Sequence, residues 1–204
     1  MTRDDNLGFY KHRNLPHLDL AGAIQFITFV LADAAPANQQ PRRRVEGNRD
    51  GDVLFLKLDA QLDRSAGECL LGDPAFSREV VDVICDSEDL GFLPLAWVVM
   101  PNHVHMVIVQ SAGCQLGRIV GRIKARSATR INRLRGVEGK LWQSGYFDRM
   151  IRSMEHLWNT IEYVHENPVQ AGLAKQAVDW EWSTARTIDL KAAMEMAGKL
   201  FKGS

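Results

Sequence analysis

The chain has 204 residues with 25 basic and 25 acidic side chains, and its net charge of zero excludes a uniformly basic nucleic-acid-binding protein. This length suits one domain with a full hydrophobic core. No apolar run is long enough to cross a bilayer, and residues 1–5 do not begin a signal peptide, so we expect a cytoplasmic protein with no membrane partner. Cys69, Cys85 and Cys114 stand far apart, which predicts neither a disulfide framework nor a zinc knuckle.

The first third of the chain predicts one clear strand. Residues 1–20 are polar and predict an irregular N-terminal extension. The β-branched and aromatic run 23–31 predicts a strand. Residues 34–48 contain two prolines and three consecutive arginines, which predict a loop or an insertion. Residues 53–58 are compatible with a short strand.

Apolar residues at helical spacing predict three helices in the rest of the chain. The first runs from Asp73 to Cys85, with proline at its first helical position. The second is an amphipathic helix over residues 116–134. The third begins after the capping residue Ser153 and ends near Glu166, because the following Asn-Pro pair should stop it.

Strands are predicted between these helices. The run 97–109 contains a Pro-Asn turn signal between two apolar segments and therefore predicts a hairpin. Alternating side chains predict another strand within residues 141–152. The order of elements indicates a ferredoxin-like α+β fold: an antiparallel sheet with helices on one face and an added C-terminal helix.

His103 and His105 are the most informative pair in the sequence. Since side chains alternate along a strand, both histidines point to the same side, together with Val107 and Val109. Two imidazoles on one face of a buried strand can chelate a metal ion. A pair of surface histidines at a sheet edge is the alternative interpretation.

Positive charge is concentrated between residues 116 and 152, where ten basic side chains stand against only two acidic ones. A protein that is neutral overall can bind a polyanion through such a basic face. An ordinary solvated helix surface is the alternative. The candidate DNA-binding residues of the helix 116–134 are Arg118, Arg122, Lys124, Arg126, Arg130 and Arg133.

Tyr163 lies on the polar side of the last predicted helix. The apolar stripe of that helix consists of Met154, Leu157, Ile161 and Val164. At 100° per residue, Tyr163 falls roughly 140° from the centre of the stripe, and Asn167 neighbours it four residues later. A phenol can act as a nucleophile, but its pKa near 10 means that it needs activation, for example by a metal ion. A tyrosine that packs at a domain edge or against a partner is the alternative.

Four blocks of the chain resemble, in order and spacing, the REP-associated tyrosine transposases, which belong to the single-tyrosine HUH superfamily (His-hydrophobic-His). The blocks are WVVMPNHVHMVI, LWQSGYFDRMIR, YVHENPVQAGL and DWEWSTA, and the resemblance extends from about residue 15 to residue 186. It implies a ferredoxin-like catalytic domain over residues 21–186. An extension at 1–20 and a helical tail at 187–204 would flank that domain.

The resemblance also implies the roles of the candidate site residues. His103 and His105 would bind Mg²⁺ or Mn²⁺, Asn167 would supply a third ligand, and Tyr163 would be the nucleophile, with Tyr146 as a rival. The implied reaction is cleavage and strand transfer of single-stranded DNA through a 5′-phosphotyrosine intermediate, without a nucleotide cofactor. The implied partners are palindromic DNA hairpins.

The basic helix would contact the hairpin backbone, and a further basic run, Arg42, Arg43 and Arg44, is a second candidate. Three tryptophans could stack on bases, although core packing is favoured for each: Trp142, Trp180 and Trp182. Two other functions remain open, a DNA- or RNA-hairpin-binding regulator that does not cut and an ordinary metal hydrolase. A monomer and a homodimer are both compatible with the sequence.

Overall fold

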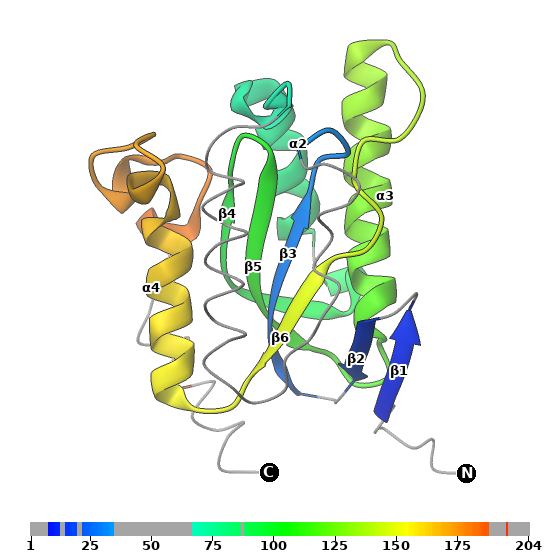
Figure 1. Cartoon of the computed structure of the whole chain (residues 1–204), viewed down its shortest axis with the longest axis vertical. Helices are drawn as coiled ribbons and strands as arrows, with labels where there is room; N and C mark the ends of the chain where they lie inside the picture. Colours follow the sequence, from blue (N-terminus) through cyan, green and yellow to red (C-terminus); the bar gives the residue numbers. More distant parts are fainter. Residues whose placement is uncertain are drawn as a thin grey trace.

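A four-stranded antiparallel sheet forms the centre of the protein (Figure 1). The computed structural model describes residues 8–12, 15–19, 22–34, 67–86, 88–187 and 195. The strands in chain order are β3 (Ile24–Val30), β4 (Phe92–Val99), β5 (His103–Gln110) and β6 (Phe147–Ile151). Among the described strands the order in the sheet is β4-β5-β3-β6, so within this set β5 and β3 are central and β4 and β6 are the outer two. The predicted strands 23–31 and 97–109 are confirmed, whereas the strand predicted over 141–152 is shorter.

Helices cover both faces of the sheet (Figure 1). On one face, α2 (Pro74–Cys85) and α3 (Leu116–Arg135) pack on the larger hydrophobic cluster. On the opposite face, α4 (Met154–Gln170) packs on a second cluster. The predicted α+β class is therefore confirmed, with α4 as the helix added to the face that α2 and α3 leave open. Short 3-10 helices connect these elements: Leu70–Gly72, Glu88–Leu90, Ala177–Asp179 and Thr184–Arg186.

The ends of the helices follow from local sequence chemistry. The Asp73 carboxylate accepts a hydrogen bond from the backbone N–H of Ala75, and the Ser153 hydroxyl accepts one from that of His156. Both residues satisfy backbone donors that a helix leaves without intrahelical partners. Helix α3 ends at Gly136, whose positive φ of 65° is accessible to glycine at little cost. The predicted beginnings of α2 and α4 are thus confirmed.

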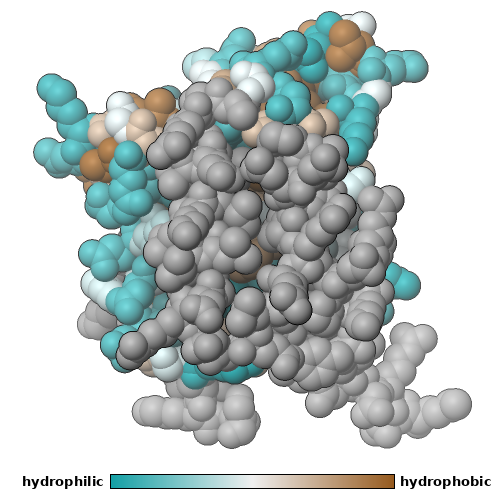
Figure 2. Space-filling model, viewed as in Figure 1, coloured by the Kyte–Doolittle hydropathy of each residue, from teal (hydrophilic) through white to brown (hydrophobic). Residues whose placement is uncertain are grey.

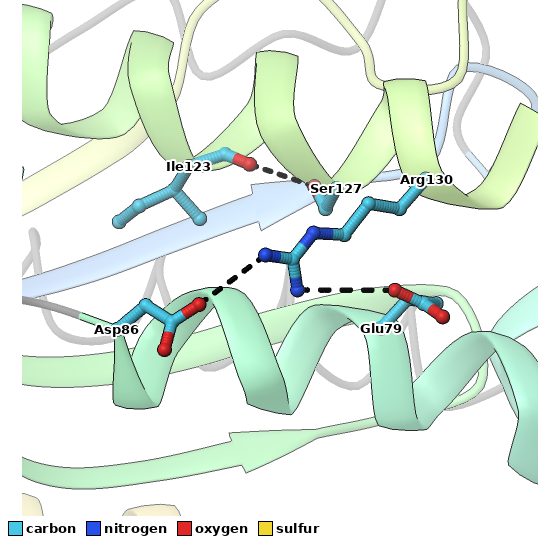
Figure 3. Close-up of polar contacts among 5 residues, drawn as sticks. All are labelled: Glu79, Asp86, Ile123, Ser127 and Arg130. Carbon is cyan, nitrogen blue, oxygen red and sulfur yellow. Dashed lines mark hydrogen bonds and ion pairs between the residues drawn. The ribbon is translucent and has the colours of Figure 1, made fainter.

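Polar contacts join α2 to α3 on their shared face (Figure 3). The Arg130 guanidinium lies 3.2 Å from the Asp86 carboxylate and 3.9 Å from that of Glu79. Deeper in the same helix, the Ser127 hydroxyl donates to the Ile123 carbonyl and accepts from the Trp142 indole N–H. Trp142 is therefore anchored in the core, as the sequence favoured.

Two expectations from the sequence are wrong, one for the N-terminal segment and one for the end of α4. Within the predicted irregular extension, β1 (Gly8–His12) and β2 (Leu15–Asp19) instead form an antiparallel pair of strands. Pro16 argues against a strand, yet a two-stranded sheet has only edge strands, where the missing N–H is tolerated. Helix α4 also does not stop at Asn167 but continues to Gln170 with Pro168 inside it. A proline this close to the end removes a single helical hydrogen bond, to the Val164 carbonyl.

Other expectations fall on residues that the structure does not describe. They concern the predicted loop 34–48 beyond residue 34, the short strand 53–58 and most of the tail 187–204. All three cysteines are described and form no disulfide, as expected. Within the described part of the chain, no helix combines the length and the apolar character that a membrane-spanning segment requires.

Candidate metal and nucleophile site

His103 and His105 lie on central strand β5 and face α4. Both side chains are completely buried at 0% exposure, and their ring centroids are 4.6 Å apart. The strand register places His105 on the face of the sheet under α4. His105 lies opposite Thr28 on β3 and opposite Val98 on β4, and Val98 belongs to the hydrophobic cluster under α4. The alternative of two surface histidines at a sheet edge is therefore wrong.

Each histidine makes a short hydrogen bond through its Nδ1 atom. His103 Nδ1 lies 2.7 Å from the Asn102 side-chain oxygen, which can only accept, so Nδ1 carries the ring proton. This leaves the lone pair of His103 on Nε2. His105 Nδ1 lies 2.7 Å from the Thr28 hydroxyl. When Nδ1 donates to that hydroxyl, His105 also presents its lone pair on Nε2, the arrangement typical of metal-ligating histidines.

Tyr163 reaches the histidines from α4. Its ring centroid lies 5.8 Å from that of His105 and 6.2 Å from that of Phe26, and its hydroxyl is buried. Phe26 also stacks on His105 at 5.5 Å, so one phenylalanine contacts both rings. The polar side of α4 predicted from the sequence therefore does not face solvent at this point. It faces the histidine pair, and the packing of Tyr163 is part of the site.

Asn167 lies one helical turn beyond Tyr163 on a neighbouring position of α4. Its side chain is completely buried, at 0% exposure. Because the helix continues through Pro168 to Gln170, Asn167 is held within a helical turn rather than at a loosened end. Its amide oxygen is a possible third ligand on the same helix as the tyrosine.

His165, between these two residues, is turned away from the site. Burial lowers the pKa of His165 to about 4, so its imidazole is neutral near pH 7. His165 Nε2 lies 2.9 Å from the Thr184 hydroxyl, which also accepts from the Trp97 N–H and donates to the Trp97 carbonyl. Since a hydroxyl has one proton, His165 Nε2 is the donor of its own bond. Thr184 therefore joins α4 to β4.

The three candidate ligands suit a divalent cation. They are two imidazole nitrogens and the Asn167 amide oxygen, and the other ring nitrogen, Nδ1, of each histidine is engaged by Asn102 or by Thr28. Among the described residues, no three His, Cys, Asp or Glu side chains form a cluster that could hold a metal ion. The mixed nitrogen and oxygen set fits Mn²⁺ better than Mg²⁺, which prefers oxygen ligands and retains several waters.

Sequence reasoning missed Thr28, Phe26 and the role of Asn102. Asn102 directly precedes His103, so a local signal existed in the printed sequence. Thr28 and Phe26 stand on a strand more than 70 residues earlier, and only the β3–β5 register places them beside His105. A single sequence does not contain that register.

The rival nucleophile and the tryptophans lie elsewhere. Tyr146 is half-buried against the cluster under α2 and α3, on the face of the sheet opposite Tyr163. Trp182 is buried in that same cluster, and the half-buried Trp180 donates its indole N–H to the Val99 carbonyl. Core packing is thus confirmed for Trp142 and Trp182.

The five α3 arginines that were predicted to bind DNA separate into two groups. An exposed group follows the helix at spacings of four and seven residues and is called here the arginine stripe: Arg118, Arg122, Arg126 and Arg133. Arg130 instead bridges to Asp86 and Glu79 on α2 (Figure 3). Figure 2 shows a largely hydrophilic surface at the far end of α3, interrupted by apolar patches, in keeping with exposed Leu134 and Val137.

Lys124 is directed into the protein and does not belong to the stripe. Its ammonium group donates to the carbonyls of Gln143 and Gly145 and lies 5.5 Å from the Phe29 ring centroid. Burial, followed by repulsion from Lys140, lowers the pKa of Lys124 to about 8. The predicted DNA contact at Lys124 thus disagrees with its geometry, because its donors are used to hold the loop before β6. Arg42, Arg43 and Arg44 lie outside the described residues.

Known proteins resemble this chain in both sequence and fold. A family model for IS200-like transposases matches residues 75–167. The REP-associated tyrosine transposase of Escherichia coli K12 is 29% identical over 89 residues, which make up 44% of this chain and 52% of that protein. A candidate REP-associated tyrosine transposase of Haemophilus influenzae is 24% identical over 115 residues, 52% of this chain and 65% of the relative. The matches therefore span about half to two thirds of the length of these relatives.

A solved structure of a REP-associated tyrosine transposase bound to a REP hairpin shares the fold. The TM-score is 0.51 at 21% identity, and the match covers 87% of this chain and 82% of that chain. The family match contains the His pair, Tyr163 and Asn167, although it ends before the DWEWSTA block. Residues 75–167 thus match the family model for IS200-like transposases, and the chain is similar in sequence to REP-associated tyrosine transposases and shares the fold of one of them.

Proposed function

We propose that this protein cleaves single-stranded DNA at palindromic hairpins and transfers the strand through a covalent bond to Tyr163. The observation that carries the proposal is the 5.8 Å separation between the rings of Tyr163 and His105. These residues come from a helix and a central strand that are 58 positions apart in sequence. An ordinary core tyrosine would not require a buried pair of histidines with their Nδ1 atoms already engaged.

In this proposal His103, His105 and Asn167 hold a divalent ion, Mn²⁺ or Mg²⁺. When bound, such an ion would polarise a phosphoryl oxygen and orient the scissile phosphate. Asn102 and Thr28 fix the histidine rings so that Nε2 of each faces the ion. Phe26 packs against both His105 and Tyr163 and thereby limits how far the two rings can move apart.

The reaction is a transesterification. The Tyr163 oxygen forms a bond to phosphorus while the bond from phosphorus to the 3′-oxygen breaks. The phenol loses its proton, and the leaving 3′-oxygen gains one. The products are a 5′-phosphotyrosine link and a free 3′-hydroxyl. Because a phosphoester replaces a phosphoester, the later strand transfer requires no nucleotide cofactor.

The DNA partner is a hairpin whose phosphates contact the arginine stripe of α3. Four exposed guanidinium groups along one helix face provide the charge that attracts a phosphate backbone without reading its sequence. Arg42, Arg43 and Arg44 are proposed as a second basic contact on grounds of sequence alone. The catalytic unit in this proposal comprises residues 21–186.

Adduct formation tests the proposal directly. Palindromic DNA oligonucleotides with single-stranded flanks, labelled at the 3′ end, are incubated with the protein and Mn²⁺ and separated under denaturing conditions. A labelled covalent adduct is expected for the wild type and for Tyr146→Phe, and none for Tyr163→Phe, which should bind the hairpin within about twofold of the wild-type affinity. An adduct that persists in Tyr163→Phe would refute the role of Tyr163. Tight hairpin binding with no wild-type adduct would favour a non-cleaving regulator.

A further inference from the structure

The C-terminal end of α3 carries two exposed apolar side chains, which are called here the α3 tip. Leu134 is 56% exposed and Val137 is 43% exposed. Helical projection places Leu134 between the directions of the buried residues Ile123 and Ile131. The apolar stripe of α3 therefore continues beyond the part of the helix that is buried in the core. Figure 1 shows this end of α3 projecting past the end of the sheet.

Hydrogen bonds fix the backbone around the α3 tip. Gly136 has a φ of 65°, and its N–H donates to the Arg133 carbonyl. The Val137 N–H donates to the Asn132 carbonyl, which completes a common closure of a helix end. The Asn132 side-chain amide also donates to the Gly139 carbonyl and ties the following loop to the helix. The α3 tip is thus a defined surface.

Positive charge flanks the α3 tip. Arg133, the last member of the arginine stripe, directly precedes Leu134. Exposed Lys140 follows Val137 by three positions, and exposed Glu138 is the acidic residue between them. Two further arginines of this part of α3 are paired with carboxylates elsewhere: Arg130 and Arg135. An apolar surface beside cationic groups repels a second copy of itself and suits a polyanion that also presents apolar faces, as unpaired bases do.

The α3 tip lies at the same end of the sheet as the histidine pair. The loop after the tip returns to the sheet at Trp142, which forms a bridge with Leu31. The Leu31 N–H donates to the carbonyl of Asn102, the residue before His103. The chain from Val137 to Trp142 spans at most about 18 Å. A hairpin stem that contacts the arginine stripe would thus have one end at the α3 tip, on the side of the histidines.

We propose that Leu134 and Val137 contact the first unpaired bases of the single-stranded flank, where it leaves the stem of the hairpin. These bases have faces that no neighbouring pair covers, and aliphatic side chains pack on such faces. The inference rests on the proposed function, because it takes the partner to be a DNA hairpin bound along the arginine stripe. The competing explanation is that single exposed apolar residues are ordinary on protein surfaces.

The test compares serine variants in the Tyr163→Phe background, in which cleavage does not interfere. Leu134→Ser and Val137→Ser, singly and together, are set against Leu173→Ser and Val178→Ser. The latter two side chains are 43% and 44% exposed and serve as matched controls. The probes are a flanked DNA hairpin, the same hairpin with abasic residues at the start of the flank, and one with abasic residues in the apical loop. Affinity is measured at several salt concentrations, and sedimentation gives the oligomeric state.

The double variant at the α3 tip should bind the flanked hairpin about fivefold to tenfold more weakly, with an unchanged salt slope, because apolar contacts release no counterions. Abasic residues at the start of the flank should weaken binding to the parent protein by a similar factor and have no further effect in the double variant. Abasic residues in the apical loop should leave the loss caused by the double variant unchanged. The two control variants should bind like the parent protein.

Three results would overturn the proposal: an equal loss on the intact and abasic-flank hairpins, a lower salt slope, or a loss no greater than in the controls. A change in oligomeric state with unchanged hairpin affinity would also overturn it and assign the α3 tip to a contact between copies of the chain. Absence of a wild-type adduct would refute the proposed cleavage instead, while the binding comparison still decides whether the α3 tip contacts the flank.

Discussion

The Asn102 side-chain oxygen lies 2.7 Å from Nδ1 of the neighbouring His103 and thereby fixes which ring nitrogen carries the proton. Both residues are buried, so water cannot readily replace this bond. The contact sits directly before β5, where the turn from β4 ends. A residue outside the proposed ligand set thus determines on which ring nitrogen the proposed ligand His103 presents its lone pair.

Replacing Asn102 by Ala should weaken Mn²⁺ binding about 10-fold to 100-fold, because His103 loses the acceptor that orients its ring. Isothermal titration of the protein with MnCl₂ measures the affinity. Asn102→Asp keeps an acceptor at this position and should bind Mn²⁺ at least as tightly as the wild type. Equal affinities for the Ala variant and the wild type would show that the bond does not orient the ligand.

Thr184 should support catalysis from a distance. Thr184→Val removes the hydroxyl that joins His165 on α4 to Trp97 on β4 and should cost about 1–3 kcal/mol of unfolding free energy. Because Tyr163 and Asn167 flank His165, adduct formation at saturating DNA should slow by about 10-fold, with hairpin affinity preserved. Urea unfolding and single-turnover kinetics measure the two effects.

Thr184→Ser keeps the hydroxyl and should restore most of the rate. If Thr184→Val lost stability but kept the wild-type rate, the contact would stabilise the fold without positioning the tyrosine.

Two arginines of the same helix should behave differently. Arg126→Gln removes an exposed charge of the arginine stripe and should lower the salt dependence of hairpin binding by about one unit of slope. Arg130→Gln removes the bridge to Asp86 and Glu79 and should change unfolding free energy by less than about 1 kcal/mol, since the pairs are partly exposed. Filter binding at salt concentrations between about 50 and 300 mM measures the slope for each variant. Identical slopes for both variants would contradict the division of the basic residues.

The buried ammonium of Lys124 predicts a pH dependence of stability. Its pKa is about 8 in the folded state against 10.5 in the unfolded state, so the unfolded state binds more protons between these values. Stability should therefore rise with pH from about 8 to 10.5, by at most about 3 kcal/mol from this residue. Lys124→Met should be less stable at pH 8, since it loses the bonds to the loop, but should lack this rise. Urea unfolding at pH 8 and pH 10 gives the comparison, and parallel changes in both proteins would disprove the assignment.

Local signals predicted much of the fold. Asp73 and Ser153 are capping residues whose chemistry is complete within three positions of sequence, and both begin helices where expected. Local signals failed at Pro16 and Pro168, because a proline is tolerated wherever its N–H is not required. Whether that holds depends on the partner strand or on the length of helix that follows, and neither is a local property.

The residues of the candidate site could be named from the sequence, but the contacts that position them could not. Alternation placed His103 and His105 on one face, and helical projection placed Tyr163 beside Asn167. The projection could not reveal that Tyr163, on the polar side of α4, packs against the sheet. That fact depends on Phe26 and Thr28, which tertiary pairing brings beside His105. Inward-facing Lys124 was likewise indistinguishable in sequence from its exposed neighbours.

The contacts of Trp182 and Ser183 with the outer edge of β4 have a practical consequence for shortened versions of this protein. Ser183 and Trp182 satisfy backbone groups of Val98 and Val99 that would otherwise form an open strand edge. Removing the chain from residue 180 onward would leave the transposase match at 75–167 intact and yet expose an apolar strand ready to pair with another molecule. Such a truncation should aggregate at concentrations where the longer chain remains dispersed, so any minimal domain must retain residues up to 186.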